Sequence, residues 1–184
     1  QNTKIKPKIS KNTKFYFGYE FFPFNDAFEK FIRKKKSIKK QIQNITIFLG
    51  GSTYQNLNLT IAKELCDFKN IRFIFGAEIN KSFEKKIFKI NKFFKISKLP
   101  NDLPKILYNS DLVISGGGYT KIETASVGTP LISIVVHKHQ IILLKNFSKK
   151  FHSIYLYENQ IKNLKSLIKK FTYEKRYRQS KKYQ

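Results

Sequence analysis

Hydrophobic and polar residues form two different kinds of pattern along this chain. Short runs rich in β-branched residues predict buried strands. Longer stretches whose apolar positions lie three or four residues apart predict amphipathic helices. The predicted strands cover residues 44–49, 71–75, 92–96, 112–115, 131–136 and 153–157, and the predicted helices cover residues 57–68, 81–89, 103–108, 119–127, 140–147 and 160–171.

This order of elements predicts the fold class. Strands that alternate with helices favour an α/β fold with a doubly wound, mainly parallel, Rossmann-like sheet. Residues 44–172 are expected to form this domain, preceded by a connecting segment (1–43) and followed by a basic C-terminal tail (173–184). Ligands of such folds bind at the carboxyl ends of the strands, near the point where the strand order reverses.

Two glycine clusters follow predicted strands. Gly50 and Gly51 follow the first, and Gly116–Gly118 follow the fourth, directly before a predicted helix. Because the carboxyl ends of parallel strands meet at one edge, we expect the two loops to share a site. A helix N-terminus beside glycines favours anions. A plain tight turn is the alternative, but three consecutive glycines exceed what a turn needs, so we favour a phosphate-facing loop.

The residues from Ser115 to Glu123, followed by Gly128-Thr-Pro130, resemble the donor-binding segment of GT-B nucleotide-sugar enzymes. The resemblance is greatest to the UDP-sugar hydrolase of pseudaminic acid biosynthesis and its spore-coat polysaccharide relatives. The chain is more distantly similar to glycosyltransferase family 28. Phe48–Ser52 also resembles the first glycine loop of these enzymes, so the resemblance touches most of residues 44–145.

The resemblance implies a binding site for a UDP-sugar. Glu123, about one and a half helical turns past Gly118, would accept two hydrogen bonds from the ribose diol. A surface glutamate favoured by the helix dipole is the alternative. The glycine loops would face the diphosphate, and backbone groups of Ile96 and Ser97 would hold the uracil. The implied site residues are Gly51, Ser52, Ile96, Ser97, Gly117, Gly118, Tyr119, Thr120, Glu123, His139 and Gln140.

Three positions depart from the family pattern and leave the identity of the sugar open. Tyr119 replaces a small residue, His139 replaces an asparagine, and Thr53-Tyr54 replaces Asp-Pro. Tyr119 would stack on the ligand or narrow the pocket. His137 and His139 have no carboxylate or cysteine at metal-ligand spacing, so we predict no metal site. No motif indicates a cofactor.

The resemblance covers only the C-terminal half of a GT-B enzyme. It implies an N-terminal domain of the same protein as partner, with the catalytic residues, including a water-activating histidine, in that domain. We therefore expect this chain alone to bind its ligand with little or no turnover; hydrolysis and glycosyl transfer both stay open. Residues 15–24 resemble the segment that joins the halves. Residues 173–184 would pack back across the interdomain cleft, with contact to RNA or a membrane as the alternatives.

A net charge of +25 raises the alternative of a basic nucleic-acid-binding module. Only four of the 37 basic residues are arginines, the residue type best suited to base and phosphate forks, and the lysines are spread along the chain. A solvated lysine-rich surface is therefore favoured, and its field suits anionic UDP-sugars and peripheral contact with anionic membranes. The lone cysteine, Cys66, falls on a helix pattern and is expected to be buried. Together with the nucleotide ligand it favours the cytoplasm.

Overall fold

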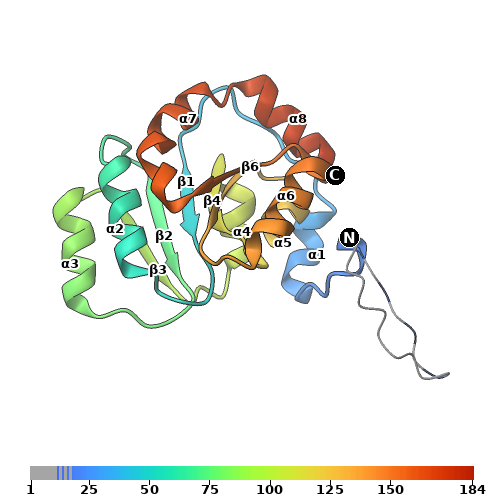
Figure 1. The fold of residues 1–184 in the computed structure, drawn as a ribbon, viewed down its shortest axis with the longest axis horizontal. Helices are drawn as coiled ribbons and strands as arrows, with labels where there is room; N and C mark the ends of the chain where they lie inside the picture. Colours follow the sequence, from blue (N-terminus) through green and yellow to red (C-terminus); the bar gives the residue numbers. More distant parts are fainter. Residues whose placement is uncertain (1–11, 13, 15, 17) are drawn as a thin grey trace.

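The computed structural model describes residues 12, 14, 16 and 18–184. Within them, six parallel strands form one sheet in the order β3-β2-β1-β4-β5-β6 (Figure 1). The strand order reverses between β1 and β4. This arrangement confirms the predicted α/β, Rossmann-like class. The strands are β1 (Ile45–Phe48), β2 (Ile71–Phe75), β3 (Lys95–Lys98), β4 (Leu112–Gly116), β5 (Leu131–Val135) and β6 (Ile154–Tyr157).

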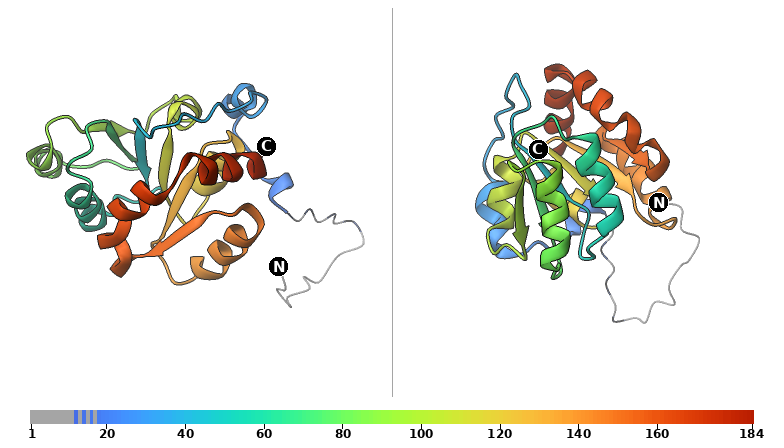
Figure 2. Two further views of the ribbon diagram at one scale, coloured as in Figure 1. Left: turned by 90° about the horizontal axis from the view of Figure 1, so that it is seen from above. Right: turned by 90° about the vertical axis from the view of Figure 1, so that its left-hand side faces the viewer.

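Helices cover both faces of the sheet (Figure 2). Helices α2, α3 and α7 pack on one face, and α1, α4, α5 and α6 pack on the other. None of the helices in the described part of the chain has both the length and the apolar character needed to cross a membrane. The helices are η1 (Tyr19–Phe21), η2 (Asp26–Phe28), α1 (Glu29–Ile32), α2 (Gln55–Glu64), α3 (Lys81–Ile90), α4 (Leu103–Asn109), α5 (Thr120–Ser126), α6 (Gln140–Phe151), η3 (Glu158–Asn163), α7 (Leu164–Lys170) and α8 (Tyr173–Tyr183).

Successive side chains along the strands point to opposite faces of the sheet, so the strands contribute to a hydrophobic core on both faces. Ile45, Ile47 and Phe73 are buried beneath α2 and α3. Val113 and Leu131 are buried on the opposite face, beneath α4, α5 and α6. The central strands are apolar on both sides because helices cover both sides, which is why their sequences read as nearly continuous hydrophobic runs.

Several elements differ from the predicted ones. Helix α2 ends at Glu64, so Cys66 lies in the turn beyond it and is exposed; the expected burial of this cysteine is wrong. The stretch predicted as one helix over 160–171 is divided into η3 and α7. The strand predicted at 92–96 begins only at Lys95.

The leading segment packs against the domain rather than standing apart from it. Phe28 and Phe31 are buried in the core cluster that lies under α4, α5 and α6. The Lys36 ammonium donates to the backbone oxygen of Tyr108 and, at 2.8 Å, to that of Ser110. The boundary at residue 44 therefore marks the start of the sheet, not of the packed unit. Part of the joining segment (residues 15 and 17) lies outside the described residues.

The basic C-terminal tail is a packed helix, α8 (dark red in Figures 1 and 2). Arg176 is 2% exposed and donates to the backbone oxygens of Phe171, Lys39 and Lys40 at 3.1, 2.9 and 2.8 Å. The side chain of Gln179 accepts from the amide of Leu131, the first residue of β5, at 2.7 Å. Helix α8 thus lies at the amino ends of the strands. The glycine loops lie at the opposite edge, so α8 packs away from them; its packing across an interdomain cleft stays a prediction.

Candidate functional site

The two glycine loops meet at the carboxyl edge of the sheet, as predicted. Phe48 of β1 pairs with Ser115 of β4, which brings the residues that follow both strands together. A Cβ atom added to Gly116 would lie 2.1 Å from the backbone oxygen of Leu49. The loop after β2 joins them, because a Cβ on Gly76 would lie 2.7 Å from Cα of Gly51. Only glycine allows this backbone-to-backbone packing.

The outer side of these loops faces open space. Added Cβ atoms at Gly51 and Gly118 would meet nothing within 4 Å, and Ser52 next to Gly51 is exposed. The amides of Gly118 and Tyr119 have no acceptor among the described residues. Two successive amides without acceptors form a cradle of the kind that binds anions.

The inner side of the second loop is tightly supported. A Cβ atom on Gly117 would lie 2.7 Å from Oε1 of Gln140, which is itself buried and accepts from the amide of Val136 at 3.3 Å. Gln140 therefore lies behind the loop, where it fixes the position of Gly117. Its assignment as a ligand-binding residue stays a prediction, because its amide group contacts protein rather than open space.

Lys121 lies on the same inner side and has no counterpart among the predicted site residues. Its side chain is 3% exposed, and its ammonium donates to the backbone oxygens of Gly117 at 2.7 Å and Gly118 at 3.0 Å. The ammonium also lies over the ring of Phe147, 5.7 Å from the ring centre. Burial lowers the pKa of Lys121 to about 8. The sequence alone suggests an ordinary lysine on a helix surface.

The predicted ligand residues at the start of α5 and within it occupy three different environments. Glu123 is half-buried, and burial raises the pKa of its carboxyl above the ordinary value. No ion pair joins Glu123 to any residue in the described part of the chain. Thr120 is 5% exposed, so its side chain faces the protein. Tyr119 is 74% exposed and contacts Phe22 of the leading segment edge to face, with ring centres 5.3 Å apart.

A short bridge of aromatic rings joins the loops after β1 and β5. The hydroxyl of Tyr54 lies 2.9 Å from Nε2 of His137, and the His137 ring stacks on that of His139 with centres 5.3 Å apart. Because β4 lies between β1 and β5, the bridge passes beside the second glycine loop. His139 is exposed there, as a ligand contact would require. Within the described residues, no three His, Cys, Asp or Glu side chains gather as metal ligands would.

Ile96 and Ser97 are not brought to the glycine loops. Both lie within β3 at the edge of the sheet, three strands from β4, which is about 14 Å at the usual strand spacing. The hydroxyl of Ser97 accepts from the Arg72 guanidinium at 2.6 Å. The assignment of their backbone to uracil stays a prediction, since only a ligand extended along the strand ends would reach both regions.

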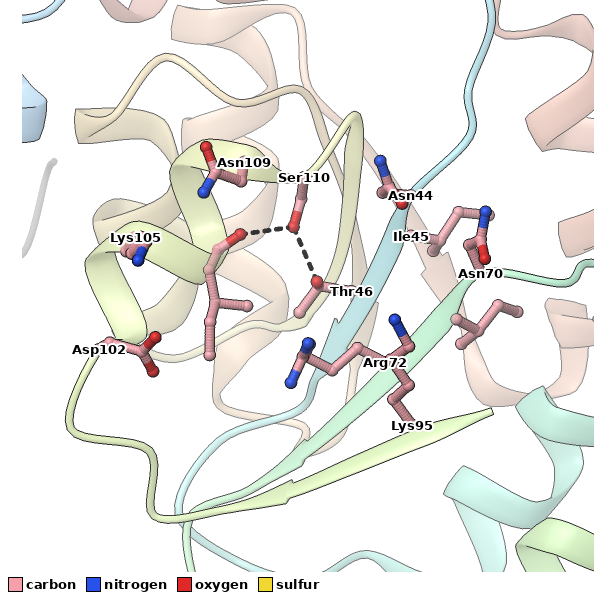
Figure 3. Close-up of a pocket in the computed structure, with 12 residues that line it drawn as sticks. Asn44, Ile45, Thr46, Asn70, Arg72, Lys95, Asp102, Lys105, Asn109 and Ser110 are labelled. Atoms are coloured by element: carbon pink, nitrogen blue, oxygen red, sulfur yellow. Dashed lines mark hydrogen bonds between the residues drawn. The ribbon is translucent and has the colours of Figure 1, made fainter. Parts of the chain in front are cut away.

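A separate hollow of about 320 Å³ lies between α4 and the amino-terminal halves of β1, β2 and β3 (Figure 3). Arg72, Lys95, Lys105 and Asp102 give it a mixed charge. Its deepest hydroxyls are already partnered: Ser110 lies 2.7 Å from Thr46 and donates to a backbone oxygen of α4. The hollow contains no glycine loop and no buried polar group without a partner, so we place the candidate site at the carboxyl edge.

Comparison with known families agrees with this geometry. A model of the glycosyltransferase family 28 C-terminal domain matches residues 44–184, which include both glycine loops and α8. The chain belongs to this glycosyltransferase family 28 domain family. The family 28 domain here is 26% identical over 156 residues to a Methanocaldococcus jannaschii protein described as uncharacterized protein MJ1062, with 78% of this chain and 32% of that protein covered.

Solved structures extend the comparison to the fold. MurG from Acinetobacter baumannii matches with a TM-score of 0.59 and 15% identity, over 83% of this chain and 48% of that one. The UDP-GlcNAc 2-epimerase from Neisseria meningitidis, solved with UDP-GlcNAc, matches with a TM-score of 0.56 and 15% identity, over 84% and 42%. This family 28 domain thus has the fold of a GT-B C-terminal half. It spans less than half of the proteins that it matches.

Proposed function

We propose that this domain binds the UDP part of a UDP-sugar at the carboxyl edge of its sheet. The observation that carries the proposal is the arrangement around Gly118. Two amides without acceptors face open space beside it. The short helix α5, which follows this loop, carries a half-buried carboxylate without an ionic partner, Glu123. Amides suit a diphosphate, and a carboxylate suits a ribose diol. The family match and the UDP-GlcNAc bound by a structural relative support this pairing.

The proposal is tested by calorimetric titration of the chain with UDP at two salt concentrations, with CMP and a short RNA as controls. Saturable UDP binding is expected, with a 10- to 100-fold loss of affinity in Glu123→Ala, because hydrogen bonds to a charged group contribute about 1.5–3 kcal/mol. Glu174→Ala, an exposed change on α8 at the opposite edge, is the matched control. Thermal unfolding of each variant checks that the fold is retained.

A different result would favour a different function. Absence of UDP binding together with salt-sensitive RNA binding that ignores Glu123 would replace the proposal with a nucleic-acid module, because phosphate neutralisation releases counterions. The open amides of Gly118 and Tyr119 favour a specific diphosphate over a diffuse polyanion.

For the whole protein, we propose a UDP-sugar hydrolase of surface-glycan biosynthesis, of the nonulosonic acid type, in which an N-terminal domain activates water. The alternative is a family 28 glycosyltransferase, in which an acceptor hydroxyl takes the place of water. The family match concerns the C-terminal domain, which both readings share, and the glycine-loop sequence resembles the hydrolase more closely. Incubation of the whole protein with a UDP-sugar, without acceptor, separates them: release of free sugar and UDP indicates the hydrolase.

A further inference from the structure

Lys121 is the one part of the glycine-loop region that the proposed function leaves without a role. A lysine is rarely buried without a partner carboxylate, because removing its charge from water is costly. Here no carboxylate lies within 4 Å of the ammonium among the described residues. Its partners are instead the backbone oxygens of Gly117 and Gly118, the two glycines that line the candidate site.

The geometry of the peptide bond links this buried contact to the open side of the loop. In a planar trans peptide, the C=O of one residue and the N–H of the next point in opposite directions. The oxygens of Gly117 and Gly118 point inward to Lys121, so the amides of Gly118 and Tyr119 point outward. Neither of these amides has an acceptor among the described residues. The ammonium therefore fixes the orientation of both donors and polarises both peptides toward an incoming anion.

We infer that Lys121 is a positioning residue that holds the Gly117–Gly118 peptides with their amides toward the diphosphate, and that its positive charge makes this cradle selective for anions. The inference rests on the proposed function. It adds a residue that touches no ligand and acts through the backbone.

The surroundings of the ammonium make its charge responsive to pH. From α6, the neutral ring of Phe147 faces it, and the neutral amide of Gln140 lies behind Gly117. Tyr19 of the leading segment packs on Phe147, and Glu123 lies two residues along α5. Burial lowers the pKa of Lys121 to about 8, so its charge is lost as the pH rises through that value. Affinity for a diphosphate is then expected to fall with the charge.

Lys36 provides a matched control. It is also a largely buried lysine whose pKa is lowered to about 8 by burial, and it also donates to two backbone oxygens, those of Tyr108 and Ser110. Those oxygens lie at the amino edge of the sheet, before β4, far from the glycine loops. Lys36→Met and Lys121→Met thus remove the same charge and the same number of contacts from opposite edges.

The test is UDP titration of wild type, Lys121→Met and Lys36→Met at pH 7 and pH 9, with thermal unfolding of each. We expect Lys121→Met to lower UDP affinity roughly tenfold at pH 7, the lower end of what loss of an orienting outer group costs. The wild type and Lys36→Met should lose affinity between pH 7 and 9, and Lys121→Met should not. Lys121→Met is expected to reduce affinity for uridine, which lacks phosphate, much less than for UDP.

The outcomes separate the two proposals. If the wild type binds no UDP, the proposed function fails. If the wild type binds UDP while Lys121→Met binds it equally well, or follows the same pH profile, the positioning role of Lys121 is overturned and the donor site stands. If Lys121→Met does not fold, the pH profile of the wild type against Lys36→Met decides, and a flat profile in both overturns the inference.

Discussion

The polar groups at one edge of the sheet have partners within the protein, and several of those at the other edge do not. At the amino edge, Arg176 donates to three backbone oxygens, and the Asp111 carboxylate accepts from the amides of Gln43 and Asn44 and pairs with Lys39. At the carboxyl edge, the amides of Gly118 and Tyr119 have no acceptors and Glu123 has no ionic partner within the described chain.

The difference separates stability from binding. Buried polar groups with complete sets of partners hold elements together, because breaking one leaves several groups unsatisfied. Polar groups that face open space without a partner in the protein do not hold elements together, and they are free to bind a ligand. Removal of partnered groups at the amino edge should therefore alter folding with little effect on UDP affinity, and removal of the unpartnered Glu123 carboxylate at the carboxyl edge should do the reverse.

The strongest test of the amino edge is Arg176→Met. The change keeps an apolar stem but leaves the backbone oxygens of Phe171, Lys39 and Lys40 without their donor. We expect the free energy of unfolding to fall by about 3 kcal/mol, since unsatisfied buried groups cost about 1–3 kcal/mol each and water replaces part of the loss. Urea unfolding measures it. UDP affinity of the folded variant should stay within about twofold of wild type; a larger loss would show that the edges are coupled.

Gly116→Ala tests where the two glycine loops join. The new Cβ would lie 2.1 Å from the backbone oxygen of Leu49, so β1 and β4 must separate at their carboxyl ends. We expect a loss of stability of about 1–3 kcal/mol and a loss of measurable UDP binding. Gly118→Ala, whose Cβ meets nothing within 4 Å, is the matched control for stability. Equal destabilisation by both changes would contradict the close packing of the loops.

The pH dependence of stability gives the smallest expected effect. Burial lowers the pKa of Lys36 from 10.5 to about 8, with Asp111 opposing the shift. Between these values the unfolded chain binds more protons than the folded chain, so the contribution of Lys36 to the free energy of unfolding rises with pH. From pH 8 to 10, the free energy of unfolding of the wild type should rise relative to that of Lys36→Met. The rise should be below the limit of about 1.4 kcal/mol per pH unit. Chemical unfolding across this range checks it, and a gain that falls with pH would contradict it.

Much of this arrangement follows from local sequence. The runs around Ile45, Ile71 and Leu112 predict parallel strands because they are apolar on both faces, and parallel strands bring their following loops to one edge. This reasoning predicted the meeting of the two glycine clusters, which the packing of Gly116 on Leu49 confirms. The class of fold and the meeting of the two glycine loops at one edge of the sheet could therefore be predicted from the sequence.

The contacts that side chains make with backbone far away in the sequence could not be predicted. Helix α8 looks like a solvated basic tail because its buried residues, Arg176 and Gln179, are polar, and their partners lie far away in sequence. Lys121 likewise looks like a surface lysine until its carbonyl partners are seen. Polar side chains that bind backbone leave no hydrophobic period, so pattern reading overlooks them.

One consequence of the sheet's outline concerns assembly rather than binding. Strand β3 lies at the edge of the sheet, with one row of backbone donors and acceptors unpaired by any other strand of the described chain. The strand is only four residues long and carries a lysine at each end, Lys95 and Lys98. Two copies brought edge to edge would place like charges against one another. The lysine excess first suggests binding to nucleic acid. At this position it instead opposes the pairing of the sheet of one molecule with the sheet of the next.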